Sequence, residues 1–194
     1  MSEFQSLANQ FLIAMPALDD PNFERAVTLI CEHTEQGALG LIINKATSLN
    51  LRQVFEQLEL PGEDDDVGHV LPDQPVMHGG PVATSRGFVL HEGAGKNTEW
   101  NSSLPLGEGL RLTTSRDIME AMAQGDGPPN ALFALGYAGW TAGQLESEMA
   151  DNAWLSVERS NDLIFHTPID ERWDAATRLL GIDPSRLSSV AGHS

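Results

Sequence analysis

The chain has 194 residues, of which 41% are hydrophobic, enough for one domain with a buried core. It carries 28 acidic and 11 basic side chains, a formal net charge of -17, and no basic run or basic tail. Affinity for nucleic acid and for anionic lipid comes mainly from Lys and Arg. The charge therefore disfavours direct DNA, RNA or membrane binding, and it favours a basic protein partner.

A single cysteine, Cys31, excludes an internal disulfide framework and fits a reducing compartment. The N-terminal apolar run is about five residues long and has no basic flank, so it does not predict a signal peptide. No stretch approaches the ~20 apolar residues of a membrane helix. We therefore expect a cytoplasmic protein that does not bind a membrane.

The first half of the chain predicts an antiparallel meander followed by a helix. Apolar and β-branched runs predict three strands joined by short turns, over residues 11–15, 25–34 and 38–44. Apolar residues at helical spacing begin at Leu51, where Asn50 and Gln53 predict a capping box. Pro61-Gly62 ends this helix, and the acidic run over residues 63–75 predicts a solvated loop.

The second half predicts six more strands, over residues 75–78, 87–91, 110–113, 131–137, 153–158 and 162–166, with the last two forming a hairpin. A polar loop is expected over residues 92–105. Three helices are predicted: one from an N-cap at Ser115 to Ala123, one capped by Thr141 and Gln144, and one that starts at Thr167-Pro168 and ends at Gly181.

These elements do not alternate strand–helix–strand, because antiparallel pairs cluster with single helices between them. The pattern predicts an α+β fold: a single domain over residues 1–194, with a mixed, mostly antiparallel sheet of about nine strands and about four helices.

Six segments together resemble the AlgH/YqgE family: FLIAMPALDDPNF, ICEHTEQGALGLIIN, HGGPV with FVLH, GYAGWTAGQLESEM, NAWL and LLGIDPSRLSSVAGH. They occur in the family's order and span nearly the whole chain. The resemblance implies a coiled α+β sheet flanked by helices. It implies little about activity, although members are labelled transcriptional regulators. No helix-turn-helix pattern and no basic helix accompany that label in this sequence.

Cys31 and His33 lie two residues apart on a predicted strand, so both are expected on the same face, as an activated thiolate requires. The alternative is that Cys31 is a small core residue. Glu32 and His33 are adjacent, so they should face opposite ways, which argues against an acid–base dyad.

The six histidines show no metal-binding spacing. His78 and His91 would become neighbours if their two strands pair, with Asp73 or Glu92 beside them, but a metal site needs three or four converging ligands. We therefore expect no metal site, and no motif implies a cofactor.

The candidates for ligand binding are Gly79, Gly80, Gly136, Gly139 and Trp140. Gly136, Gly139 and Gly143 are predicted where a strand gives way to a helix, a place that can hold an anion. Their spacing matches neither the dinucleotide fingerprint nor the P-loop, which favours tight turns that let Trp140 pack. Gly79-Gly80 is a similar turn with a possible anion nest.

The sequence thus favours a non-enzymatic regulatory domain that acts through a protein or small-ligand contact. A thiol-dependent sensor or enzyme centred on Cys31 and His33 is the first alternative. A direct DNA-binding regulator is the second, and the net charge disfavours it.

Overall fold

The computed structural model describes residues 3–15, 18, 20–60, 74–92 and 100–181. Within these ranges it contains ten strands, five α-helices and one 3-10 helix. The strands are β1 (Gln10–Ala14), β2 (Val27–Thr34), β3 (Gly37–Ile42), β4 (Ala46–Asn50), β5 (Pro75–His78), β6 (Val82–Glu92), β7 (Ser103–Gly107), β8 (Leu110–Thr113), β9 (Ala131–Thr141) and β10 (Trp154–Glu158). The helices are α1 (Leu51–Gln57), α2 (Arg116–Ala123), α3 (Gln144–Ala150), α4 (Asn161–His166) and α5 (Arg172–Leu179), with the 3-10 turn at Ile169–Glu171.

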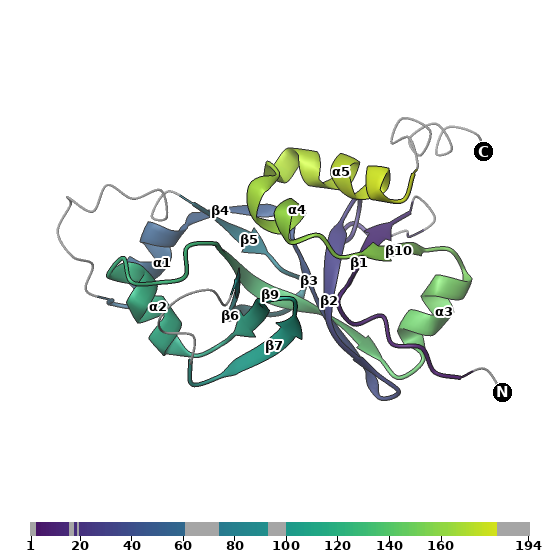
Figure 1. Cartoon of the computed structure of the whole chain (residues 1–194), viewed down its shortest axis with the longest axis horizontal. Coiled ribbons are helices and arrows are strands. Elements are labelled where there is room, and N and C mark those ends of the chain that lie inside the picture. Colours follow the sequence, from purple (N-terminus) through teal and green to yellow (C-terminus); the bar gives the residue numbers. More distant parts are fainter. Residues whose placement is uncertain (1–2, 16–17, 19, 61–73, 93–99, 182–194) are drawn as a thin grey trace.

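The strands form one sheet in the order β10-β1-β2-β3-β9-β6-β8-β7, with β5 pairing both β4 and β9. All described pairings are antiparallel except that of β5 with β9. The α+β prediction and the β1–β2–β3 meander are therefore confirmed. Helices α1 and α2 lie at one end of the sheet, α3 at the other, and α4 and α5 along one side (Figure 1).

The sheet curls until its two edge strands are joined through one side chain. Arg159 follows β10, and its guanidinium donates to the backbone oxygens of Leu106 (2.9 Å) and Gly107 (2.8 Å) on β7. It also donates to Asn9 Oδ1 at 3.1 Å. This clasp helps to enclose a core that includes Phe11, Leu29, Cys31 and Leu112.

Two smaller cores flank the first. One lies under α1 and α2 and includes Val54, Val89, Met119 and Phe133. The other lies under α3 and includes Ile30, Trp140, Leu145 and Trp154. Neighbouring residues of β1 and β2 alternate between the enclosed core and the α3 core, as expected of strands buried on both faces.

One predicted strand is wrong: residues 162–166 belong to helix α4 rather than to a hairpin. Ser160 caps this helix, because its Oγ accepts from Leu163 N at 3.2 Å. Leu163 and Ile164 pack into the enclosed core. A short apolar run is compatible with either a buried strand or one buried helical turn. Packing against the rest of the core stabilises the helix here. Thr167 is consequently the C-cap of α4, and not the N-cap of a following helix.

Other differences concern strand extent. β4 was not predicted, and β7 begins inside the segment expected to be a polar loop and runs two residues beyond it. β9 runs on to Thr141, because β3 pairs with its second half. The capping box of α1 is confirmed, whereas the N-cap of α3 is Gly143 and not Thr141.

The helix end at Pro61-Gly62, most of the acidic and polar loops and the final turn after Gly181 fall outside the described residues. Within the described part of the chain, no helix is both long and apolar enough to span a membrane.

Candidate functional site

An open groove of about 500 Å³ runs over strands β2, β3, β9 and β6. Its floor follows from the strand register. Leu39 pairs with Glu32 on one side and with Gly139 on the other, and the next row joins Thr34, Gly37 and Thr141. Because paired residues lie on the same face of a sheet, this row structure gathers side chains from three distant segments into one hollow.

The groove is hollow because glycines stand in both rows. A Cβ on Gly139 would meet the Tyr137 ring at 3.4 Å and Val82 at 3.9 Å, which are ordinary contact distances. A Cβ on Gly139 would therefore fit in contact with the groove wall. Gly37 differs, because it has φ +142° and a Cβ there would lie 2.3 Å from the Trp140 carbonyl oxygen.

The groove has an apolar wall and a polar rim. Leu39, Val82 and Tyr137 form the wall, and the Tyr137 ring packs edge-to-face on Phe88 with centroids 5.8 Å apart. Glu32, Thr34 and Gln36 are exposed at the rim. No Lys, Arg or His is among the described residues that line the groove. A cationic ligand with an apolar stem therefore suits this surface better than an anion does.

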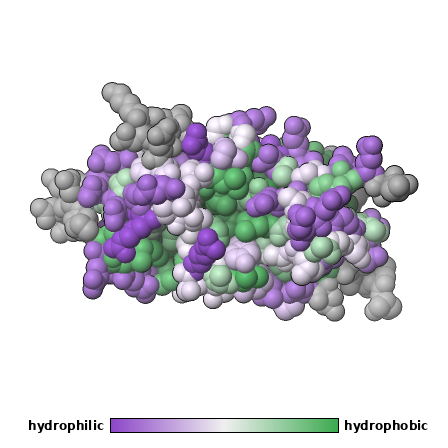
Figure 2. Space-filling model, turned by 90° about the horizontal axis from the view of Figure 1, so that it is seen from below, coloured by the Kyte–Doolittle hydropathy of each residue, from purple (hydrophilic) through white to green (hydrophobic). Residues whose placement is uncertain are grey.

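The face seen from below the view of Figure 1 carries apolar side chains gathered across its middle (Figure 2). Among the described residues, Val82 on β6 is 38% exposed and Leu104 on β7 is 43% exposed. Isolated exposed apolar residues are ordinary on a protein surface. The groove is a candidate site because of its shape and its charge, and not because of exposure alone.

The predicted glycine sites have a packing role. Gly79-Gly80 crosses β9 at Gly136 with the two backbones in contact: a Cβ on Gly80 would lie 2.1 Å from the Tyr137 carbonyl carbon, and one on Gly136 would lie 2.4 Å from the Gly80 oxygen. Gly136 and Gly139 lie inside β9 and not at a strand-to-helix turn, which corrects the prediction. The close crossing leaves little room for an anion at Gly79 and Gly80.

Trp140 belongs to an aromatic cluster. Its ring lies 5.9 Å from that of Trp154 and 6.3 Å from that of Phe23. Glu148 Oε2 accepts from both indole nitrogens, at 2.9 Å from Trp140 and 3.1 Å from Trp154. Trp140 is 6% exposed and belongs to the core under α3, and it is also among the residues that line the groove.

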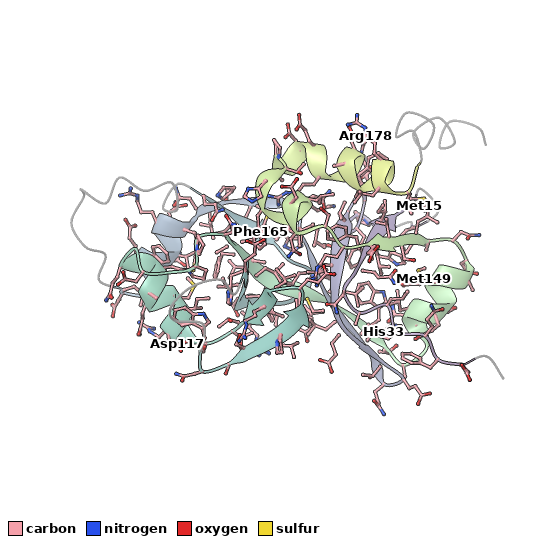
Figure 3. The ribbon with its side chains drawn as sticks, in the orientation of Figure 1. Met15, His33, Asp117, Met149, Phe165 and Arg178 are labelled. Atoms are coloured by element: carbon pink, nitrogen blue, oxygen red, sulfur yellow. The ribbon has the colours of Figure 1, made fainter. Side chains whose placement is uncertain are left out.

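His33 is buried in a hydrogen-bonded arrangement that its sequence position did not reveal. The backbone N–H of Leu7 donates to Nδ1 at 2.9 Å, so Nε2 carries the proton and donates to Glu146 Oε1 at 2.6 Å. Burial opposes ionisation of Glu146, but its backbone hydrogen bond and His33 outweigh that effect and lower its pKa. Figure 3 shows His33 on the β2–β3 side of the molecule, near α3. This pair ties the N-terminal segment and α3 to β2.

Cys31 lies in the enclosed core, whereas His33 reaches α3 on the other face of the sheet. The prediction that both point the same way is wrong, because the register of β2 shifts between Ile30 and Glu32. The thiol is 5% exposed, and burial raises its pKa to about 12 against a smaller opposing effect of Arg159. This environment argues against an activated thiolate.

His78 and His91 do not become neighbours. β5 and β6 each pair with β9, where His78 lies opposite Leu135 and His91 opposite Ala131. His91 Nε2 instead shares a hydrogen bond with Thr113 Oγ1 at 2.7 Å. Asp73 falls outside the described residues, and within the described part of the chain no three His, Cys, Asp or Glu side chains converge as metal ligands.

Sequence reasoning missed Leu39 and Val82 of the groove wall. Each looks like an ordinary strand residue, and only the pairing of β3 with β9 and β6 brings them together. One signal was present. All described lining residues fall in three of the segments that carry the family resemblance, over residues 30–44, 78–82 and 136–149.

Comparisons with known proteins support that resemblance. Residues 11–185 match a family model described as AlgH-like. A UPF0301 protein of Thioalkalivibrio sulfidiphilus is 53% identical over 193 residues and covers 100% of both chains. A UPF0301 protein of Ralstonia nicotianae is 50% identical over 188 residues, covering 97% of this chain and 95% of that one.

Two solved structures share the fold. The solution structure of the AlgH protein from Pseudomonas aeruginosa has a TM-score of 0.77 and 45% sequence identity, covering 100% of this chain and 99% of that one. The crystal structure of protein DIP2367 from Corynebacterium diphtheriae has a TM-score of 0.71 at 17% identity, covering 100% and 95%, and shows likeness of fold alone. With these matches along its whole length, the chain belongs to the AlgH-like family.

Proposed function

We propose that this protein is a non-enzymatic, cytoplasmic regulatory domain that holds an extended, basic segment of a partner protein in the groove over β2, β3, β9 and β6. One observation carries the proposal: the groove joins the Glu32 carboxylate to an apolar wall, with no cationic side chain among its described lining residues. The regulatory role in this proposal is taken from the label of transcriptional regulator that family members carry.

Lysine and arginine side chains match this chemistry. Their long aliphatic stems can pack on Leu39 and Val82, while the charged head reaches Glu32 or the face of the Tyr137 ring. The net charge of -17 attracts a basic partner over a longer range and raises the association rate at low salt. The same field repels DNA, so a transcriptional effect would pass through a protein contact.

The test uses a labelled peptide in which lysine alternates with leucine or valine, and measures its binding by fluorescence anisotropy at low and at physiological salt. Gly139→Val should weaken binding at least about fivefold, because it adds apolar bulk to the groove floor at an exposed strand position where a Cβ makes ordinary contacts. Glu32→Gln should weaken binding and reduce its salt dependence.

Glu35→Gln is the matched control, because Glu35 is exposed in the same hairpin and does not line the groove. The groove is not the site if Gly139→Val binds as the wild type does, or if Glu32→Gln and Glu35→Gln have equal effects. Equal binding of a peptide with glutamate in place of lysine would refute the basic partner. A mobility shift with DNA at low salt would instead support the direct DNA-binding alternative.

A further inference from the structure

A second hollow lies at the other end of the molecule, between helices α1 and α2 and the strands β6 and β9. Its volume is about 340 Å³. Six apolar side chains form most of its floor and walls: Val54, Leu58, Val89, Met119, Phe133 and Leu135. None of the described residues that line it belongs to the groove over β2 and β3, so the two hollows are separate.

The cavity exists because the strands around it end at different places. β8 pairs with β6 only over Val89 to Glu92. After Thr113, where β8 ends, the chain enters α2. Ser85 and Gly87 of β6 therefore have no residue of β8 paired beside them. Helices α1 and α2 roof this gap, but side chains do not fill it. Since the liquid volume of one water is about 30 Å³, the space suits a ligand of roughly ten to twelve non-hydrogen atoms.

Arg116 is the one cationic residue among the described residues that line the cavity. Arg116, in the first turn of α2, donates through Nη2 to the Leu58 carbonyl oxygen at the end of α1 (2.7 Å) and through Nε to Glu120 Oε1 (3.2 Å). Its side chain is 56% exposed. These bonds hold the guanidinium across the gap between the two helices and leave Nη1 without a hydrogen-bond partner among the described residues.

The neighbouring polar groups also favour an acceptor on the ligand. Ser85 and Thr114 line the cavity, and both residues are exposed, so their hydroxyls are accessible to a ligand. The nearby carboxylate of Asp117 does not compete for the guanidinium, because it accepts from Ser115 Oγ and from two backbone amides. Glu120 Oε1 pairs with the guanidinium at 3.2 Å through Nε, so a ligand acceptor would share the guanidinium with Glu120 and bind at Nη1. The mouth thus offers an N–H donor and two hydroxyls above an apolar floor.

We propose that this cavity binds a small amphipathic carboxylate, with an unbranched apolar tail of about eight to ten carbons in the cavity and its carboxylate on Arg116. The tail buries against Val89, Met119 and Phe133. The head accepts from the guanidinium and from the Ser85 and Thr114 hydroxyls. A positive anchor is needed to hold such an anion on a chain whose net charge is -17.

The test titrates the full chain with decanoate below its micelle concentration, by calorimetry and by NMR of the Met119 and Val89 methyl groups. Decyltrimethylammonium presents the same tail with the opposite charge, and acetate presents the head without the tail. Decanoate should bind one to one, with half-saturation at or below about 1 mM, and should shift those methyl signals. The other two probes should not saturate in that range.

Two variants separate the tail site from the head site. Ser85→Trp places bulk in the cavity from an exposed strand position and should abolish the methyl shifts. Arg116→Gln should weaken decanoate about tenfold, the usual effect of losing one charge-assisted hydrogen bond. Arg52→Gln is the matched control, because Arg52 is exposed on α1 and does not line the cavity.

Several results would overturn the proposal. They are the absence of saturation by decanoate at 5 mM, equal binding of decyltrimethylammonium, and an Arg116→Gln affinity equal to that of Arg52→Gln. If Ser85→Trp does not fold, the comparison of the two arginine variants still decides.

Discussion

The clasp formed by Arg159 should be a main support of the curled sheet. Its side chain is 4% exposed and donates to Leu106 O, Gly107 O and Asn9 Oδ1. Replacing it with methionine keeps much of the apolar stem but removes the two hydrogen bonds to β7 and the one to Asn9. Among the described residues, the hydrogen bond from Asn161 Nδ2 to the Glu108 carbonyl oxygen (3.3 Å) would remain between the segments that follow β10 and β7.

The magnitude follows from the bonds and from burial. Hydrogen bonds to a charged group contribute about 1.5–3 kcal/mol each, and the cost of burying the guanidinium offsets part of that gain. Burial disfavours the charged guanidinium and lowers the pKa of Arg159. The neighbouring Glu108 and Cys31 raise the pKa by less than burial lowers it. We expect Arg159→Met to lower the free energy of unfolding by about 3 kcal/mol, a loss of about 1 M or more in the urea midpoint.

The assay is urea unfolding combined with hydrogen exchange. Amides of β7 and β8 should exchange faster in Arg159→Met, whereas those of β2 and β3 should change less. Glu108→Gln is the matched control, because that carboxylate lies 3.7 Å from the guanidinium and is 82% exposed, so it should cost about 0.5 kcal/mol or less. The clasp is refuted if both variants have the same midpoint, or if β7 exchange is unchanged.

Three further predictions concern single residues. With a pKa near 12, Cys31 should react with a thiol reagent at pH 8 about a thousandfold more slowly in the folded protein than in urea; equal rates would contradict its burial. Gly80→Ala should lower the melting temperature by roughly 6–12 °C, because its φ is +157° and the new Cβ would meet backbone, whereas Gly139→Ala should change it little. Asp117→Asn should cost about 1 kcal/mol at pH 7. Burial opposes ionisation of Asp117, but Ser115 and backbone amides outweigh it and lower its pKa. The wild type should therefore be more stable than Asp117→Asn above the pKa that Asp117 has in the unfolded chain. It should lose this extra stability as the pH falls through the pKa of Asp117 in the folded protein, which urea melts at pH 7 and pH 3 would test.

Local signals predicted the elements whose determinants lie within a few residues. The capping box of Asn50 and Gln53 closes over one helical turn, and it is present with Gln53 N donating to Asn50 Oδ1 at 3.0 Å. The strands over β1, β2 and β3 follow from runs of apolar residues. The family resemblance also came from the sequence, because its segments are contiguous.

Local signals failed where a distant partner decides. Leu163 and Ile164 form a helix because they pack into the enclosed core, although the same apolar run suits a strand. Cys31 and His33 occupy opposite faces because a register shift against β3 interrupts the alternation of β2. Neither partner is visible from the residues themselves.

The charge, the fold class, the first helix cap and the family were determined by the sequence itself, since composition and short-range spacing carry them. The groove and the clasp were decided by tertiary structure. Glu32, Leu39 and Gly139 share one row only after β3 has paired with a strand about a hundred residues away, and Arg159 meets β7 only after the sheet has curled. Those contacts depend on closing long loops and on register, which no local pattern of residues encodes.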